Sequence, residues 1–260
     1  MVSMPVPVSA VSFLNSLPMV YGLQKMMPPK LIALSVDVPS RCAERLAAGE
    51  VAVGLIPVVE TLAIPHARFI SRYCIGATGA VDSVMLASSV PVGEITRIYT
   101  DPHSRTSVML ARILAKAHWK IEPEWIDVAQ PVTARDLRPG EAAVVIGDKA
   151  FSFSTRYRYD LAEAWLAHTG LPFVFAGWVS PIELPSAFTE AFDHAVGWGI
   201  AHLREAVYNC RQLPVHPDTA IHYLEHYIEF ELTAPKQEGL AKFLSLARDF
   251  RLDPTRKMEK

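Results

Sequence analysis

Cysteine is scarce in this chain of 260 residues, and positive charge is not concentrated anywhere along it. The three cysteines, Cys42, Cys74 and Cys210, are odd in number and widely spaced, which argues against a disulfide framework or a cysteine zinc site and suits a reducing compartment. Lysine and arginine number 25 against 27 acidic residues, and they form no basic cluster. Nucleic acid is therefore not expected as a partner, because phosphate contacts need concentrated positive charge.

Long hydrophobic runs are also missing, although half of the residues are hydrophobic. The amino terminus is apolar but carries no lysine or arginine before Lys25, and prolines interrupt it, so it does not predict a signal peptide. The apolar segment 173–179 is bounded by Pro172 and Pro181 and is too short to cross a bilayer. We therefore expect a soluble, cytoplasmic protein without a membrane partner.

Strand-like and helix-like segments alternate in two sets, at 8–64 and 95–150, on either side of an extended segment at 68–90. Such alternation predicts mainly parallel sheets with helices on their faces. From Pro185 onward only helical periodicity is found, which predicts a helical C-terminal tail packed on the first set. The fold class is therefore α/β with a helical tail.

The two sets predict two α/β lobes: residues 1–88 with 178–260, and residues 89–177 inserted between them, with a ligand cleft where the lobes meet. Ligands of open parallel sheets bind beyond the carboxyl ends of the strands. The residues predicted there are mostly small and polar, and several begin helices: Asn15, Ser16, Pro39, Ser40, Pro57, Ser104 to Ser107, Gly147 and Asp148. Each one taken singly is better explained as a helix cap, but several of them on one sheet edge favour a site for a small anion.

The segment Ser104-Arg105-Thr106-Ser107 is the richest of these positions in polar groups. It places three hydroxyls and successive backbone N–H groups within one helical turn, a nest that can cradle an oxyanion. Arg105 can add a bidentate clamp on a carboxylate. An exposed or interlobe salt bridge is an equally good interpretation of Arg105, because surface pairs reveal little about function.

Successive motifs at these positions resemble those of the chorismate dehydratases of the futalosine route to menaquinone. The motifs are VSFLNSLP, DVPSR, GLIP, GAVDSVMLAS, SRTSVML, VVIGDKA and YDL followed by LPFVFAGWV, and they run in the family's order from about residue 8 to 180. Phe13 and Ser16 stand where the family often has Tyr and Thr, and Lys149 follows the Gly-Asp pair. The dihydroxynaphthoate synthases of the same pathway share the fold but usually open with an acidic motif, so VSFLNSLP favours the dehydratase.

The resemblance implies the type II periplasmic-binding-protein fold adapted to catalysis. The implied enzyme is a hydro-lyase that converts chorismate to 3-[(1-carboxyvinyl)oxy]benzoate and water, with no metal or organic cofactor. The substrate would be a small dicarboxylate, and we expect a monomer or a homodimer. By motif match the cleft residues are Asn15, Ser40, Ser83, Ser104, Thr106, Ser107, Gly147 and Asp148. The resemblance thus adds Ser83 to the residues found at strand ends.

The sequence leaves two candidates for the group that accepts the ring proton. The hydroxyls would stabilise charge on the ring carboxylate, and Asn15 would lie near the leaving hydroxyl or a carboxylate as a neutral donor. Asp148 is the one strong candidate base among the acids, but it is better explained as an acceptor for a helix or interlobe N–H. The remaining option is substrate assistance, in which the enolpyruvyl carboxylate takes the ring proton.

Two alternatives come from other classes. The segment His222-Tyr223-Leu224-Glu225-His226 matches the H-x-x-E-H pattern of zinc peptidases. Its polar residues lie opposite an apolar helix face, so a solvated amphipathic helix is the better interpretation. The second alternative is a binding protein without catalysis on the same fold. Cys42, in a helix beside a predicted site loop, is expected to be a buried and inert thiol.

Overall fold

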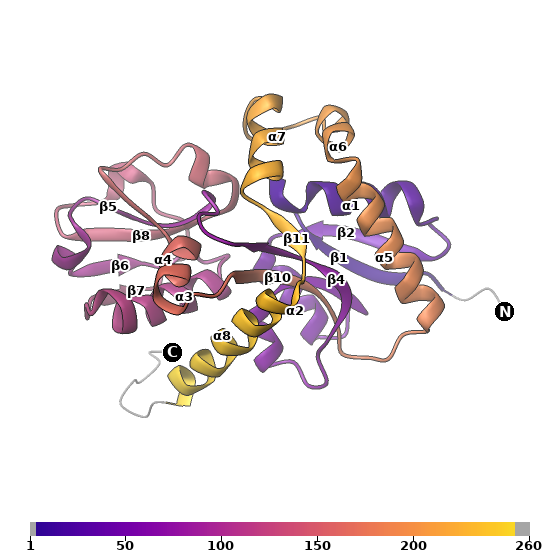
Figure 1. Ribbon diagram of the computed structural model, residues 1–260, viewed down its shortest axis with the longest axis horizontal. Helices are drawn as coiled ribbons and strands as arrows, with labels where there is room; N and C mark the ends of the chain where they lie inside the picture. Colours follow the sequence, from indigo (N-terminus) through magenta and orange to yellow (C-terminus); the bar gives the residue numbers. More distant parts are fainter. Residues whose placement is uncertain (1–3, 253–260) are drawn as a thin grey trace.

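The protein has two β-sheets, each flanked by helices, which form two lobes (Figure 1). We describe it from a computed structural model that covers residues 4–252. The six-stranded first sheet has the order β11-β4-β10-β3-β1-β2, with β1 (Val6–Val11), β2 (Ile32–Asp37), β3 (Val53–Pro57), β4 (Arg68–Ala77), β10 (Phe173–Ser180) and β11 (Glu229–Glu231). The five-stranded second sheet has the order β7-β6-β8-β5-β9, with β5 (Val84–Ser88), β6 (Arg97–Tyr99), β7 (Glu124–Ile126), β8 (Glu141–Ile146) and β9 (Tyr157–Asp160). The predicted two-lobed α/β architecture is confirmed.

The sheets are mixed, which corrects the expectation of mainly parallel pairing. β1 pairs parallel with β2 and β3, and β6 pairs parallel with β7 and β8. The other pairs, made by β4, β5, β9, β10 and β11, are antiparallel. The reason is topological: β4 leads out of the first lobe and β10 returns to it, so these two neighbouring strands run in opposite directions.

The lobe boundaries also differ from those expected. The chain crosses between the lobes at 78–83 and at 170–172. Residues 84–88, expected in the first lobe, form β5 of the second sheet, and residues 173–177, expected in the second lobe, belong to β10 of the first sheet. The extended sequence pattern of residues 84–88 and 173–177 predicts that both are strands, but it does not indicate which sheet each strand joins.

Eight α-helices cover the sheets, and none of them within residues 4–252 is long and apolar enough to span a bilayer. They are α1 (Leu17–Met26), α2 (Pro39–Ala47), α3 (Thr106–Leu114), α4 (Leu161–Thr169), α5 (Ser186–Ala201), α6 (Leu203–Asn209), α7 (Pro217–His226) and α8 (Ala234–Leu252). Helices α1 and α5 cross closely, because Gly22 of α1 has no side chain: a Cβ there would lie 2.1 Å from the carbonyl oxygen of Ala195. This crossing anchors the tail on the first lobe.

The tail departs from the prediction in two respects. It is not purely helical, since β11 joins the edge of the first sheet between α7 and α8. It also does not pack on the first lobe alone: α8 contacts β10 and also α3, and its Phe243 ring lies 6.1 Å from that of Trp165 in α4. Both rings are fully buried. The closing helix therefore packs on both lobes, which helical periodicity cannot reveal.

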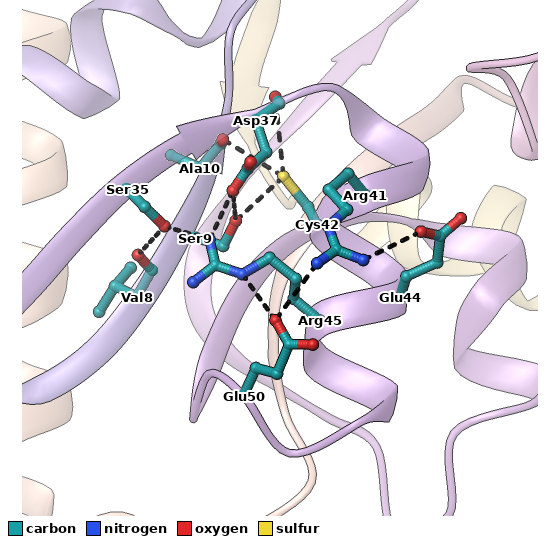
Figure 2. A network of polar contacts seen from close by, with 10 residues as sticks. All are labelled: Val8, Ser9, Ala10, Ser35, Asp37, Arg41, Cys42, Glu44, Arg45 and Glu50. Carbon is teal, nitrogen blue, oxygen red and sulfur yellow. Dashed lines mark hydrogen bonds and ion pairs between the residues drawn. The ribbon is translucent and has the colours of Figure 1, made fainter.

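A polar network holds α2 against the first sheet (Figure 2). Asp37, at the end of β2, accepts hydrogen bonds from Ser9 of β1 at 2.9 Å and from Arg45 of α2 at 2.6 Å. The Cys42 thiol donates to the carbonyl oxygen of Ala10 at 3.2 Å. Burial raises the pKa of the Cys42 thiol to about 11, so it is protonated at neutral pH. Cys42 is thus the buried thiol that was predicted, and the network holds the later part of α2 against β1 and β2.

Asp160 fixes the first crossover. As the N-cap of α4 it accepts from the N–H groups of Ala162 and Glu163, and its second oxygen accepts from Val81 at 2.9 Å and Asp82 at 2.7 Å. The crossover residues immediately before β5 are thereby tied to the start of α4. These bonds set the position of Ser83, which is the next residue.

Candidate functional site

A cleft of about 520 Å³, counting the part open to solvent, lies where the two lobes meet. Its polar lining residues are Asn15, Ser83, Ser104, Arg105, Thr106, Ser107 and Gly147. Its apolar lining residues are Val11, Phe13, Pro39, Pro57, Ile75, Val81, Val84, Ile146, Phe175 and Ala176. Segments from both lobes and from the first crossover therefore share one cavity, with a single charged side chain, that of Arg105.

Two of the predicted site residues are not among the lining residues. Ser40 is buried in the first turn of α2, and its neighbour Pro39 reaches the cleft in its place. Asp148 lies beside the cleft in the short 3-10 helix Gly147–Phe151, where its carboxylate accepts a hydrogen bond from the Leu14 N–H at 2.9 Å. Leu14 belongs to the first lobe and Asp148 to the second, so the interlobe acceptor interpretation of Asp148 is confirmed.

The helix starts at the cleft are not capped by side chains. Helices α1, α2 and α3 have no side-chain cap hydrogen bond, whereas α4 is capped by Asp160. Ser16, expected as the cap of α1, donates instead to the carbonyl oxygens of Val11 and Phe13. The cap interpretation of these residues is therefore wrong, because their side chains leave the first-turn N–H groups uncovered. An uncapped helix start is suited to an anion.

The loop before α3 is held by Asp101. Its side chain accepts from the N–H of His103 at 2.9 Å, its carbonyl oxygen accepts from the N–H of Ser104 at 3.0 Å, and it forms an ion pair with Lys149. The hydroxyl of Ser104 is buried without a hydrogen-bond partner. An unpartnered buried hydroxyl is costly, and this one belongs to a residue that lines the cleft.

Polar contacts join the lobes around the cleft. Besides the Leu14–Asp148 bond, the N–H of Val59 donates to the hydroxyl of Thr106 at 3.2 Å. Arg105 lies 3.8 Å from Glu44 of α2, and both side chains are largely exposed. Arg105 thus combines the two interpretations left open by the sequence, since it lines the cleft and also forms an interlobe ion pair.

Position 147 requires glycine for two reasons, its backbone conformation and the close approach of a neighbouring ring. Its φ of +64° is a conformation that side chains rarely adopt, and a Cβ there would lie 2.8 Å from the ring of Phe13. The close approach brings the second lobe against Phe13, the residue that stands where the resembling family often has Tyr. A larger residue at position 147 would hold the lobes apart.

Tyr223 of α7 is a neighbour of the site that the sequence did not reveal. Its hydroxyl is hydrogen-bonded to the hydroxyl of Ser83 at 2.7 Å. Its ring packs edge-on against Phe151 of the second lobe, with ring centroids 5.0 Å apart. The side chain lies on the apolar face of α7, so periodicity marks it as core only.

The amino-acid sequence matches one protein family over most of its length. The model of proteins of menaquinone biosynthesis matches residues 6–249. The chain belongs to the menaquinone biosynthesis family. It is 26% identical over 234 residues to the chorismate dehydratase of Thermus thermophilus, covering 79% of this chain and 83% of that protein.

Solved structures similar to this menaquinone biosynthesis family member include proteins described as periplasmic binding proteins or as having their fold. The aliphatic sulphonate binding protein SsuA of Escherichia coli matches with a TM-score of 0.61 and 14% identity, covering 97% of this chain and 94% of that one. A protein of Archaeoglobus fulgidus matches with a TM-score of 0.73 and 16% identity, covering 95% and 98%. A Candida albicans protein described as having that fold matches at 0.63 and 13%, covering 95% and 91%. These likenesses confirm the predicted fold.

The H-x-x-E-H segment of this family member is a solvated helix face. His222, Glu225 and His226 are exposed on α7, and Glu225 accepts two hydrogen bonds from Arg204 at 2.7 and 2.8 Å. Among the described residues 4–252, no group of three His, Cys, Asp or Glu side chains could hold a metal ion. The amphipathic-helix interpretation is confirmed by these positions.

Proposed function

We propose that the protein is a chorismate dehydratase, a hydro-lyase that removes water from chorismate to give 3-[(1-carboxyvinyl)oxy]benzoate. The observation that carries the proposal is the cleft itself, where uncapped helix starts, hydroxyls and one arginine converge from two lobes. Chorismate has two carboxylates, and such donors bind carboxylates without a buried cation. Membership of the menaquinone biosynthesis family and the likeness to a curated chorismate dehydratase support the same reaction.

One carboxylate of chorismate is assigned to the start of α3. There Ser104, Thr106 and Ser107 line the cleft, and the partnerless Ser104 hydroxyl gains an acceptor. Arg105 exchanges its weak contact with Glu44 for the carboxylate. The second carboxylate lies toward the first lobe, so that the two lobes hold the substrate from both ends and exclude water.

The reaction is an elimination in which atoms balance without an oxidant or reductant. A ring C–H bond and the neighbouring C–O bond break, the hydroxyl leaves as water, and the ring becomes aromatic. Because aromatisation supplies the driving force, the protein has to lower one proton-transfer barrier. Donors around the ring carboxylate stabilise the charge that develops there as the proton leaves.

The substrate's own enolpyruvyl carboxylate is the proposed base. Asp148 is the nearest acidic candidate, but its carboxylate accepts from Leu14 and is not among the residues that line the cleft. The other ionisable side chain at the cleft, Arg105, is a cation and cannot accept a proton. A base carried by the substrate is consistent with a lining that is otherwise uncharged.

A binding protein without catalysis is the second candidate, because similar solved structures include a sulphonate binding protein. The test is to incubate the purified protein with chorismate and follow the loss of its diene absorbance together with the mass of the product. Loss of the diene with a product lighter by one water supports the dehydratase. Tight binding of chorismate without turnover would support the binding protein and overturn the enzymatic proposal.

A further inference from the structure

An ion pair between Asp101 and Lys149 joins two segments of the second lobe that reach the cleft. One segment, residues 100–105, follows β6, and the other, the short 3-10 helix Gly147–Phe151, follows β8. Because β6 and β8 are neighbouring parallel strands, both segments lie at the sheet edge where ligands of such sheets bind. Asp101 and Lys149 are not lining residues themselves, but their segments supply three: Ser104, Arg105 and Gly147.

The Asp101 carboxylate is buried, and both of its oxygens are engaged. Its side chain is only 2% exposed, one oxygen accepts from the N–H of His103 at 2.9 Å, and the other pairs with the Lys149 ammonium. Burial of a carboxylate is costly unless a cation and hydrogen-bond donors compensate its charge. Lys149 supplies that cation while its own side chain, 38% exposed, stays partly in water. Lys149 therefore keeps the Asp101 carboxylate in its buried position.

The position of Asp101 determines the shape of the loop before α3. The Asp101 carbonyl oxygen accepts from the N–H of Ser104 at 3.0 Å, in addition to the bond from His103 to its side chain. The next carbonyl oxygen, that of Pro102, accepts from the Arg105 guanidinium at 3.1 Å. Ser104 and Arg105 both line the cleft, and the buried Ser104 hydroxyl has no hydrogen-bond partner in the part of the chain that the structure describes. The placement of these two groups therefore depends on where Asp101 is held.

The short helix that carries Lys149 is also tied to the first lobe. Asp148, the residue before Lys149, accepts from the N–H of Leu14 at 2.9 Å, and Asn15, the residue after Leu14, lines the cleft. Two consecutive side chains thus hold two different segments of the cleft lining, one in each lobe. The short helix therefore sets the first lobe's contribution and the loop before α3 relative to each other.

We propose that Lys149 is a positioning residue that, through the buried Asp101 carboxylate, fixes Ser104 and Arg105 where they meet the ligand. The inference rests on the proposed function in one respect, because its effect on catalysis is measured with chorismate. Lys149 does not line the cleft, so it acts through the geometry of the loop. A displacement of about 1 Å at a site can lower a rate by about 100-fold, so a small movement of this loop is sufficient.

The kinetic test compares Lys149→Met with Arg97→Met, which removes a matched ion pair. Arg97 and Glu141 begin the same two strands, β6 and β8, at the ends opposite to Asp101 and Lys149. Their side chains are 44% and 6% exposed, with Nη1 and Oε1 3.1 Å apart, so an exposed cation again compensates a buried carboxylate. Neither residue lines the cleft. Both substitutions therefore remove a stabilising pair, but only one of them lies beside the site.

Lys149→Met is expected to lower kcat/KM for chorismate by about 10- to 100-fold, while Arg97→Met leaves it unchanged. Lys149→Arg keeps the positive charge beside Asp101 and is expected to retain most of the activity. Thermal unfolding of each variant, measured alongside, confirms that folded protein is compared. Wild-type kcat/KM in folded Lys149→Met protein, or equal losses in the two methionine variants, overturns the proposal.

A double-mutant cycle tests whether Lys149 acts through Asp101. Asp101→Asn keeps an oxygen that can accept from the His103 N–H, but it removes the negative charge that Lys149 compensates. If Lys149 acts through this charge, Lys149→Met combined with Asp101→Asn loses less kcat/KM than the product of the two single losses. Multiplicative losses would show that the two side chains act independently, and they would overturn the proposal.

A third measurement needs no substrate and so distinguishes failure of this inference from failure of the proposed function. Hydrogen exchange of the backbone N–H groups of His103 and Ser104, followed by NMR, reports whether Asp101 still holds them. Exchange is expected to be at least about tenfold faster in Lys149→Met than in wild type, and unchanged in Arg97→Met. Equal exchange in Lys149→Met and wild type overturns the inference even if chorismate is turned over. Faster exchange confined to Lys149→Met supports it even if wild-type protein fails to dehydrate chorismate.

Discussion

Replacement of Asp148 tests whether this carboxylate joins the lobes or takes the substrate proton. The Asp148 oxygen accepts from the Leu14 N–H across the cleft at 2.9 Å. Asp148→Asn keeps a carbonyl oxygen for that bond, whereas Asp148→Ala leaves the Leu14 N–H without it. A buried donor that loses its partner costs about 1–3 kcal/mol, which is about a 5- to 160-fold change in an equilibrium constant.

We expect Asp148→Asn to keep turnover within about fivefold of wild type, since an acceptor for Leu14 remains. Asp148→Ala should raise KM for chorismate by a factor within the range of about 5 to 160. The reason is that part of the free energy lost with the Leu14 hydrogen bond comes from the closed arrangement of the lobes. Steady-state kinetics and calorimetric binding of chorismate measure both effects. If Asp148→Asn binds chorismate normally but no longer turns it over, Asp148 is the base and the substrate-assisted mechanism is wrong.

The same variant has a signature in the pH dependence of stability. Burial raises the pKa of Asp148 above its ordinary value of 3.8, and the bond from Leu14 offsets this only in part. The folded state therefore holds the proton more tightly than the unfolded state, and the stability from this group is lost as pH rises through the raised pKa. Urea unfolding should show wild type losing stability relative to Asp148→Asn as pH rises from about 4 to neutrality. A difference that does not vary with pH would contradict the assigned burial.

Two further predictions concern the clamp and the helix crossing. Arg105→Gln should raise KM for chorismate about tenfold, with a smaller effect on kcat. Glu44→Gln removes the same ion pair and should not raise KM. Equal effects of the two substitutions in binding assays would mean that the ion pair alone matters. Gly22→Ala should lower the free energy of unfolding by about 3 kcal/mol, since its Cβ would meet the Ala195 carbonyl oxygen at 2.1 Å. Gly93→Ala, where nothing lies within 4 Å, is the control in chemical denaturation. Equal stability of these two variants would refute the close crossing.

Local patterns in the sequence determined most of the elements and the polar residues at the strand ends. Ser104 to Ser107 were predicted to open a helix beside a cleft, and they line it. Gly170 was predicted to end a helix and does so with φ +73°. These features depend on neighbours a few residues apart, so periodicity and turn chemistry suffice to find them. The three-residue strand β11 lacked any such signal, because it exists only by pairing with β4.

The tertiary structure alone decided which of these residues meet. Asp148 reaches Leu14 from 134 positions away, and Tyr223 reaches Ser83 from 140, across lobes and tail. No pattern along the chain records such distances, because they follow from how β4 and β10 route the chain between two sheets. The sequence therefore identified the hydroxyls of the cleft, while only the packed structure could assign Asp148 to the lobe contact and Tyr223 to the wall behind the site.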